Sequence, residues 1–454
     1  MRARLLSFDL TARPCRTRLP FRFGIATMTE APMLVATARV GTEAGEVTGC
    51  AADLLVPKWF SKDPGTSHDE DRRALANGAR DAARLITERG EGTVFDHWRA
   101  AQAELVEGRP APLVPMFGVA LVERALIDAV CRAAERSFAE VLREDLLGLR
   151  FGELDAALAG WRPASLGARR ESVRLRHTVG LADDLEDADL GPDADRTDGH
   201  PITLAEDVDR YGLTSFKVKV SGDRAADEAR LRRISGLIPE GAEVTLDGNE
   251  QYADPGLLAD ALDALAAAGG AERILDGLVS IEQPVSRLRT FDPETAPGVA
   301  RLAERAPVII DEADATLDAF PRAAALGYDG VSVKACKGVL RALLSRARID
   351  ATGRGFQSAE DLTNLPPWPL LQDLAVVSAL GLPHVERNGH HYFRGAGHLS
   401  ADERSQLARR HPDLFTSEAH LRIEAGELEL GSLDRHGFGT DLLPATDASE
   451  VAAP

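Results

Sequence analysis

Between residues 215 and 337 the chain repeats one pattern, in which a short apolar run ends in charged or polar side chains. The runs are Ser215-Phe-Lys-Val-Lys-Val, Glu243-Val-Thr-Leu-Asp-Gly-Asn, Leu278-Val-Ser-Ile-Glu-Gln-Pro, Val308-Ile-Ile-Asp-Glu and Gly330-Val-Ser-Val-Lys-Ala-Cys-Lys. A helical pattern follows each run. Alternation of strands and helices predicts a parallel sheet, and in a barrel the catalytic groups lie where the C-terminal ends of the strands converge.

The same alternation continues on both sides of this stretch. His177-Thr-Val-Gly, preceded by Ser172-Val-Arg-Leu-Arg, is a plausible first strand, and strands beginning near Gly355 and Leu382 bring the number to eight. Helices are expected at 222–237, 256–268, 339–352 and 368–380. Eight strands fit a closed barrel, so we expect an α/β fold with a catalytic TIM-type barrel over residues 136–399.

Residues 1–135 have a different pattern, which predicts an α+β domain. A β run starts at Met33, helices are expected at 67–89 and 94–106, and apolar residues from Val119 to Ala133 recur at helical spacing, as on one face of an amphipathic helix. The segment 400–454 contains a short helix and the apolar run 421–430. We expect this segment to pack on the N-terminal domain.

Composition narrows the class of protein. With 454 residues the chain is long enough for two domains, and its formal net charge of −19 disfavours a nucleic-acid or anionic-membrane partner. The four cysteines are far apart in the sequence, which argues against a disulfide framework or a zinc knuckle. Since no apolar run approaches the roughly 20 residues of a membrane span, and the N-terminus lacks a signal core, a cytoplasmic location is expected.

The charged strand ends predict a site inside the barrel. Side chains alternate across a strand, so Lys217 and Lys219 share one face, and strands two and six of an eight-strand ring place Lys219 opposite Lys334. Between these lysines, three neighbouring strands each end in a carboxylate: Asp247, Glu282 and Asp311. Hard oxygen ligands without histidine or thiolate suggest Mg²⁺, with Mn²⁺ as an alternative.

Such a site suits proton abstraction next to a carboxylate. The ion would stabilise the negative charge that develops on the substrate's carboxylate oxygens. Burial, the cation and Lys217 all disfavour the protonated form of Lys219, which favours its use as a base. Lys334 can do the same from the other side.

At these residues the chain resembles the enolase superfamily, in particular its muconate-lactonising-enzyme and mandelate-racemase-like members. Lys217-Val-Lys219 is similar to the Lys-x-Lys motif of that family, and Leu246-Asp-Gly-Asn249, Ile281-Glu-Gln-Pro284 and Ile310-Asp-Glu312 are similar to its metal-ligand segments. Pro20-Phe-Arg-Phe-Gly-Ile-Ala-Thr and Val122-Glu-Arg-Ala-Leu-Ile-Asp128 look like parts of its capping domain.

The resemblance implies a modified (β/α)7β barrel with an α+β capping domain built from both termini, and it implies a symmetric homo-oligomer. It also implies metal binding by Asp247, Glu282 and Asp311, acid and base catalysis by Lys219 and Lys334, and electrostatic assistance from Lys217. Asn249 would support the metal shell. One departure is Gly338-Val339, where the family usually has two adjacent glycines.

Further residues are candidates for substrate or supporting contacts, each with a structural alternative: Glu312, Glu360, Asp361, His384, Glu386, Lys58 and Trp59. The acidic loop 183–199 is interpreted as a solvated surface loop, with a lid as the functional alternative. For His390, His391 and His398 we favour surface or interdomain packing over a metal site.

The predicted activity is Mg²⁺-dependent abstraction of an α-proton from a small-molecule carboxylate, through an enediolate. Two opposed lysines favour an isomerase, namely a racemase, epimerase or cycloisomerase. The alternatives are a lyase of the dehydratase or o-succinylbenzoate synthase type, a barrel enzyme with a Schiff-base lysine, and a non-catalytic binding descendant of the fold.

Overall fold

The computed structural model describes residues 1–192, 194, 196–444 and 451–452. In these residues eight parallel strands form a closed barrel, because each strand pairs with the next and β14 pairs with β7. Their bounds are β7 Ser172–Val179, β8 Ser215–Lys219, β9 Glu243–Asp247, β10 Leu278–Glu282, β11 Val308–Ile310, β12 Gly330–Val333, β13 Phe356–Ala359 and β14 His384–Arg387. The predicted barrel with a capping domain is confirmed.

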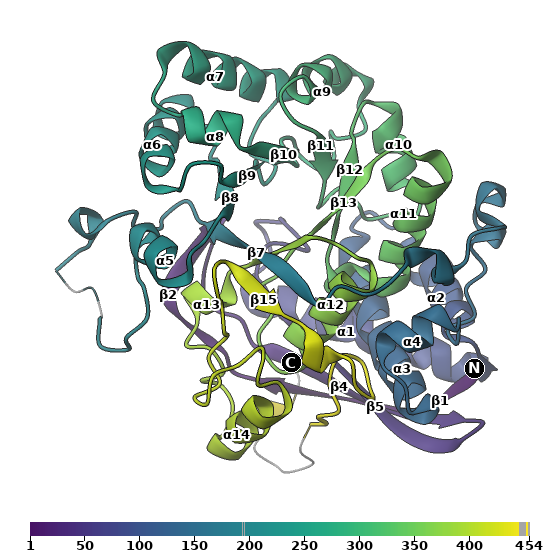
Figure 1. The fold of residues 1–454 in the computed structure, drawn as a ribbon. Coiled ribbons are helices and arrows are strands. Elements are labelled where there is room, and N and C mark those ends of the chain that lie inside the picture. Colours follow the sequence, from purple (N-terminus) through teal and green to yellow (C-terminus); the bar gives the residue numbers. More distant parts are fainter. Residues whose placement is uncertain (193, 195, 445–450, 453–454) are drawn as a thin grey trace.

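Helices cover the outside of the barrel (Figure 1). They are α5 Leu204–Tyr211, α6 Arg224–Leu237, α7 Pro255–Ala268, α8 Glu272–Asp276, α9 Ala296–Ala303, α10 Ala319–Ala325, α11 Val339–Thr352 and α12 Trp368–Ala379, followed by the short α13 Gly389–Tyr392. The predicted helix bounds agree to within two residues. Alternate strand residues such as Phe216, Val218 and Leu246 are fully buried, as expected for side chains between strands and helices.

The N-terminal part forms an antiparallel sheet with helices packed on it. Strands β1 Ala3–Arg13, β4 Met33–Thr42 and β5 Gly45–Leu54 make the sheet, β6 Glu91–Gly92 adds to β1, and β2 Arg16–Phe23 pairs with β3 Ala26–Glu30 in a separate hairpin. The helices are α1 His68–Arg89, α2 Val94–Ala101, α3 Leu113–Ala134 and α4 Phe138–Arg143; α2 continues into a π-helical turn, Gln102–Val106.

Helix α3 is buried on all sides from Met116 to Cys131, so the prediction of one amphipathic face is wrong. The helix lies between the N-terminal sheet and the barrel, and both surfaces cover it. Its polar residues are paired: Arg124 forms an ion pair with Asp53, and Asp128 accepts hydrogen bonds from the backbone N–H groups of Cys50 and Phe438. A helix between two domains needs such partners because an unpaired buried charge is costly.

The C-terminal segment contacts both parts of the molecule. Helix α14, Ala401–Arg410, carries Glu403, which forms an ion pair with Arg13 of β1 at 2.7 Å. Part of the run 421–430, which was expected to pack on the N-terminal domain, instead forms β15, Glu427–Glu429, which pairs antiparallel with β7 of the barrel. Strand β16, Val451–Ala452, pairs with β1. Residues 445–450 and 453–454 of this segment lie outside the described residues.

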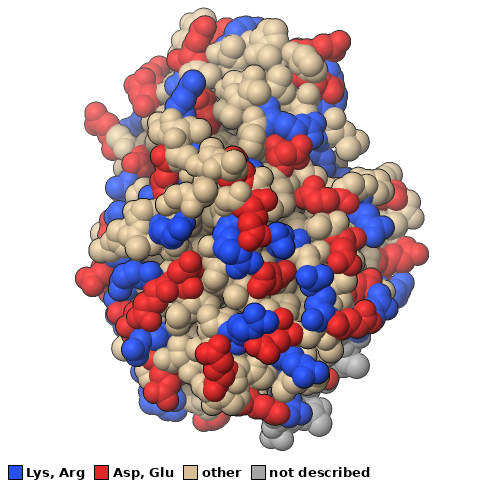
Figure 2. Space-filling view, turned by 90° about the vertical axis from the view of Figure 1, so that its right-hand side faces the viewer, with Lys and Arg blue, Asp and Glu red and all other residues tan. Residues whose placement is uncertain are grey.

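The surface mixes both signs of charge. On the face shown in Figure 2, acidic and basic side chains are interspersed rather than separated into large patches. Exposed ion pairs such as Arg301 with Asp263 fit this pattern. In the part of the chain that the structure describes, no helix has both the length and the apolar character to cross a bilayer.

Helix α3 also contacts the start of α11, just after the sixth barrel strand. A carboxylate oxygen of Glu123 accepts a hydrogen bond from the backbone N–H of Leu340 at 2.6 Å. Gly338 has a φ of 107°, and a Cβ placed there would lie 2.8 Å from the other oxygen of Glu123. The single glycine before Val339 is therefore required both by its backbone conformation and by the contact with α3.

We predict that Gly338→Ala lowers the free energy of unfolding by about 1–3 kcal/mol, because the residue would be strained and would displace Glu123. Urea unfolding followed by circular dichroism measures the change. Gly236→Ala is the matched control, since Gly236 lies in α6 with open space around its Cα, and alanine should raise stability there by up to about 1 kcal/mol. Equal stability of the Gly338 variant and the parent protein would contradict the prediction.

Candidate active site

The inside of the barrel is lined by buried charges that pair with one another. The Lys217 Nζ atom lies 2.8 Å from Glu282, 3.0 Å from Glu386 and 3.1 Å from Asp247, and it also forms an ion pair with Glu360. Burial alone would lower the pKa of Lys217, but these acids raise it well above its ordinary value. Lys217 is therefore a permanent cation at the centre of the site.

The other two predicted lysines each face one acid. The Lys219 Nζ atom is 2.5 Å from Asp247, and the Lys334 Nζ atom is 2.6 Å from Asp311. Lys219 ends β8 and Lys334 directly follows β12, which is four strands further around the ring. The structure thus places the two amines on opposite arcs of the barrel, as the sequence predicted.

The charges around Lys334 favour its protonated form. Burial does lower the pKa of this amine, but the adjacent Asp311 carboxylate outweighs burial and raises it above the ordinary value for lysine. Here the acids face the lysines directly, so they stabilise the protonated amine.

The acids on the three adjacent strands differ in how well their charge is compensated. Burial raises the pKa of Asp247 and Asp311, but nearby lysines outweigh it and hold both values below the ordinary range. The pKa of Glu282 is raised well above its ordinary value, first by burial and then by Asp247 and Glu360. Glu282 therefore marks the place where negative charge is in excess and where a further cation would stabilise the site most.

These acids do not form a ready-made ligand group. Among the described residues, three ligand atoms of His, Cys, Asp or Glu lie within 4.8 Å of one another only in a different cluster, away from Asp247, Glu282 and Asp311. The oxygens of the three acids contact lysine amines instead. A cation bound by all three would have to compete with Lys217, Lys219 and Lys334 for the same oxygens.

The donor set nevertheless fits Mg²⁺. Two further oxygens next to these acids in the sequence, Oδ1 of Asn249 and Oε2 of Glu312, are buried and have no hydrogen-bond partner. The Asn249 amide nitrogen lies 3.4 Å from the other oxygen of Glu312, so the two side chains are neighbours. Carboxylate and amide oxygens without nitrogen or sulfur donors are the ligands that Mg²⁺ prefers.

The sequence analysis missed Arg176 and Thr178 on the first strand. Arg176 forms an ion pair with Glu360 and donates a 2.9 Å hydrogen bond to Ser358, and Thr178 donates to Glu386 at 2.6 Å. Both side chains position acids that contact Lys217. Strand alternation in Ser172–Val179 was the available signal, since Arg176 and Thr178 share a face.

Lys337 and Ser332 were also missed, although both lie in a segment with a predicted site lysine. Ser332 donates to Asp311, and the Lys337 Nζ atom lies 3.3 Å from Asp311 and 3.4 Å from Asp314. Asp311 is thus held by three donors, including Lys334. These contacts explain why its carboxylate stays ionised when fully buried.

Two of the predicted acids, Glu360 and Glu386, line the same cluster, but His384 and Asp361 do not. His384 begins β14 and contacts Arg176 at 3.1 Å, two residues before Glu386 on the same strand. Asp361 accepts hydrogen bonds from the backbone N–H groups of Asn364 and Asn388, and burial raises its pKa to about 7. Neither residue contacts one of the three site lysines in the structure.

The loop after β5 covers the catalytic end of the barrel. The Trp59 ring lies over Lys334, with 4.8 Å between the Nζ atom and the ring centroid. Arg287, which follows β10, donates to the backbone carbonyls of Trp59 and Phe60, and it forms an ion pair with Glu250 at 2.8 Å. Lys58 points elsewhere, because it contacts Thr66 of its own loop and Asp71 in the first turn of α1.

A cavity of about 490 Å³ lies beside this loop. Its lining combines the loop, the turn before α3 and the ends of β10 and β11, and it includes Phe60, Lys62, Leu113, Glu250, Phe291 and Glu312. Much of the lining is apolar, but Glu312 and Glu250 connect it to the acids of the barrel. The cavity is large enough for a small organic molecule.

The acidic loop 183–199 is mostly exposed in its described part, as expected for a surface loop; residues 193 and 195 lie outside the described residues. Two of its acids are tied to the rest of the protein. Asp183 accepts hydrogen bonds from the Gly180 N–H and the Tyr392 hydroxyl, and Asp198 forms a 2.7 Å ion pair with Arg18 of β2. Whether the loop acts as a lid stays a prediction.

Comparison with known proteins relates this architecture to a known family and to solved structures. A family model described as Enolase C-terminal domain-like matches residues 202–441. A 2-chloromuconate cycloisomerase from Rhodococcus opacus 1CP matches the structure with a TM-score of 0.64, at 18% sequence identity over 96% of each chain. No curated protein sequence matches the chain.

Two other solved structures were determined with ligands. An enolase from Bradyrhizobium complexed with magnesium and mandelic acid gives a TM-score of 0.60 at 19% identity over 94% of each chain. A dipeptide epimerase from Enterococcus faecalis V583, complexed with Mg and the dipeptide L-Leu-L-Tyr, gives 0.63 at 15% identity over 97% of this chain and 99% of that chain. At these identities the likeness shows the fold.

We predict that Arg176→Met lowers the free energy of unfolding by about 3–5 kcal/mol, because it leaves the buried Glu360 carboxylate without its arginine partner. The double variant Arg176→Met/Glu360→Gln should recover a large part of this loss. Urea unfolding measures both effects. Arg301→Met, which breaks an exposed ion pair, is the control and should cost about 1 kcal/mol or less. A similar small cost for Arg176→Met would show that the buried pair is unimportant.

Proposed function

The chain belongs to the Enolase C-terminal domain-like family, and on this basis we propose that it is an enzyme that removes the proton α to the carboxylate of a small molecule. The observation that carries the proposal is the pair of buried amines, Lys219 and Lys334, on opposite arcs of a barrel whose intervening strands end in carboxylates. Such an arrangement offers a base on either side of a substrate carbon.

In this proposal Asp247, Glu282 and Asp311 hold Mg²⁺, with Mn²⁺ as an alternative. When bound, the ion supplies Lewis-acid stabilisation of the negative charge that develops on the substrate's carboxylate oxygens. The excess negative charge around Glu282 and the unpartnered oxygens of Asn249 and Glu312 support this assignment. Lys217 would remain protonated and balance the negative charge of the acids.

Base catalysis requires that an amine lose its proton. Asp311 favours the protonated form of Lys334, so Lys334 becomes a better base when the oxygens of Asp311 have another partner. Ligand binding by Asp311 and activation of Lys334 are therefore coupled in this proposal.

The stereochemical outcome depends on what the second lysine does. If it returns the proton to the opposite face of the enediolate, the enzyme is a racemase or epimerase, and ring opening or closure from the same intermediate would make it a cycloisomerase. Loss of a β-substituent would make it a lyase. We favour the isomerase because both amines face the site.

We propose that the substrate enters through the cavity beside Trp59. The part of the substrate that does not react would stay bound in this cavity. The lining offers apolar contacts from Phe60, Leu113 and Phe291 and a few charged groups at the inner end. Trp59 would exclude water from Lys334. The ligands of two structural neighbours, mandelic acid and a dipeptide, are both carboxylates, which agrees with this substrate class.

We predict that Asp247→Asn and Glu282→Gln each weaken Mg²⁺ binding at least tenfold, because each removes a charged oxygen ligand. Isothermal titration with MgCl₂ measures the affinity. Asp263→Asn, which changes an exposed acid, should bind like the parent protein. If the parent protein binds no Mg²⁺ or Mn²⁺, the metal assignment fails and a non-catalytic binding protein becomes the better interpretation.

We predict that Lys219→Ala and Lys334→Ala each reduce α-proton exchange by about 10²–10⁴-fold while the fold persists, because each removes a proton-transfer group. Exchange is followed by NMR in D₂O with a library of N-acyl amino acids, dipeptides and hydroxy acids. Lys58→Ala is the matched control, since this lysine belongs to the covering loop but points away from the site.

Full exchange activity of the Lys334 variant would refute the two-base assignment. A covalent adduct trapped by borohydride, together with activity that survives EDTA, would instead establish a Schiff-base lysine. Accumulation of an eliminated product would move the assignment from isomerase to lyase.

A further inference from the structure

A second cluster of buried titratable residues lies outside the barrel lumen, between β7, α5 and α13. It consists of His177, Asp207, His390 and His391, whose exposed fractions are 8% or less. His177 lies between Arg176 and Thr178, which contact groups inside the barrel, so its ring faces the surrounding helices. Of the two packing positions expected for His390 and His391, surface or interdomain, the surface position is wrong because both side chains are buried. His398 is separate from the cluster and bonds to the Pro366 carbonyl.

The atoms of this cluster are close enough to share an ion. Nδ1 of His177 lies 3.0 Å from Nε2 of His390, and Nε2 of His177 lies 3.8 Å from Oδ2 of Asp207. One ligand atom from each of these three residues lies within 4.8 Å of those of the other two. Tetrahedral zinc sites with bonds of about 2.0–2.1 Å place their ligand atoms roughly 3.4 Å apart, so small side-chain rotations would suffice.

Several polar atoms in the cluster lack a partner. Oδ1 of Asp207 and Nδ1 of His390 are buried and make no hydrogen bond. The other oxygen of Asp207 lies 2.7 Å from Nδ1 of His391, so His391 is the histidine that contacts this carboxylate most closely. Leaving a carboxylate oxygen buried without a partner is costly, and a metal ion would remove that cost.

The two other histidines are suited to bind a metal. Both rings are buried, which disfavours the charged form of an imidazole. A neutral imidazole has a lone pair for a metal. The aspartate adds one negative charge, and a set of nitrogen and carboxylate ligands suits Zn²⁺ better than Mg²⁺ or Ca²⁺.

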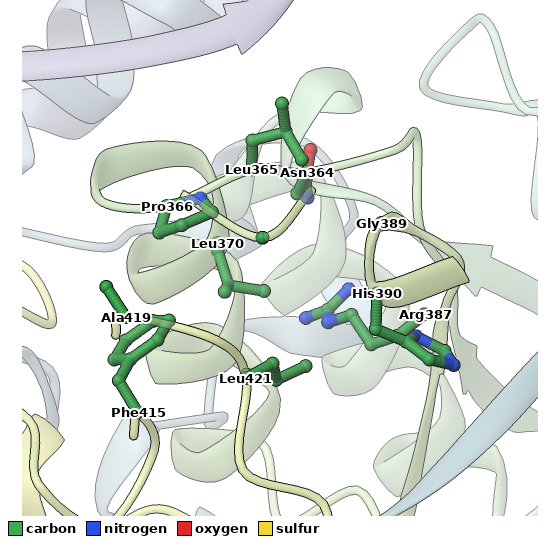
Figure 3. A pocket seen from close by; sticks show the side chains of 11 residues that line it. Asn364, Leu365, Pro366, Leu370, Arg387, Gly389, His390, Phe415, Ala419 and Leu421 are labelled. Atoms are coloured by element: carbon green, nitrogen blue, oxygen red, sulfur yellow. The ribbon is translucent and has the colours of Figure 1, made fainter. Parts of the chain in front are cut away.

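A small cavity adjoins the cluster at His390. Its volume is about 20 Å³, and Figure 3 shows His390 and Arg387 next to each other in its lining, with Leu365, Leu370, Phe415 and Leu421. This volume admits one water molecule. Nε of Arg387 is also buried without a hydrogen-bond partner. A water here could accept the second N–H of His390, as metal-bound histidines commonly require.

We propose that His177, Asp207 and His390 form a structural zinc site, distinct from the acids inside the barrel, in which His391 positions Asp207. The ion would join three elements that are far apart in the sequence: the first barrel strand, the helix after the acidic loop, and the helix after the last strand. Tyr392 of α13 stacks on Phe21 of β2 with 4.2 Å between ring centroids. The site would therefore also stabilise the attachment of the hairpin formed by β2 and β3 to the barrel.

The test is calorimetric titration of the chelator-treated full-length protein with ZnCl₂ in excess MgCl₂, so that the barrel acids do not compete for zinc. We expect about one equivalent of Zn²⁺ to bind tightly. Asp207→Asn and His390→Gln should each weaken binding at least 100-fold. His398→Gln, which changes a histidine outside the cluster, and Asp247→Asn, which changes a barrel acid, should bind Zn²⁺ like the parent protein.

Cobalt(II) provides a second measurement that needs no variant. Stoichiometric Co²⁺ should give the strong visible absorption of a tetrahedral site with nitrogen and oxygen ligands. Absence of Zn²⁺ binding and of this absorption in the parent protein would overturn the proposal and leave a purely hydrogen-bonded histidine cluster. Zn²⁺ binding that is lost in Asp247→Asn but kept in the cluster variants would overturn it too. Neither result bears on the proposed proton-transfer function, which is read from Mg²⁺ affinity and α-proton exchange.

Discussion

Pairing of buried charges inside the barrel is the constraint on which the rest of the structure depends. Lys217 is surrounded by acids from four other strands, and Arg176 supports one of these acids from the first strand. A charge without a partner would be strongly destabilising at such a position, so each residue is required by the others. A barrel core is usually filled with apolar layers, and replacing one layer with ion pairs is justified only if the charges serve a ligand.

The parts of the protein outside the barrel act on this set of charges. Helix α3 fixes the start of α11 through Glu123, close to the segment that carries Lys334 and Lys337. The loop containing Trp59 is held over Lys334 by Arg287, which is itself paired with Glu250. The capping domain therefore excludes water from the lysine and contributes to its position, which links the closure of the molecule to the chemistry proposed for it.

Much of the site could be predicted because the relevant signals are local. Apolar runs ending in Lys219, Asp247 or Glu282 identify both the strand and the end at which the charge lies, and side-chain alternation assigns the face. Arg176 and Thr178 carry the same alternation but lie in the middle of a strand, where no motif singles them out. His384 was expected to line the cavity but contacts Arg176 at the start of its strand, because the start of a strand cannot be defined from its sequence alone. The ion pair with Asp311, which raises the pKa of Lys334, likewise depends on which strands become neighbours.

By itself, the sequence determined the alternating barrel, the chemical type of each strand end and the order of the strands, because these depend on residue patterns within short segments. Only the tertiary structure decided which charges meet. Lys337 reaches Asp311 and Asp314, and His177 meets Asp207 and His390, which lie 30 and 213 residues away along the chain. Such encounters depend on barrel closure and on the packing of helices against its outer face, which bring together residues that share no local pattern.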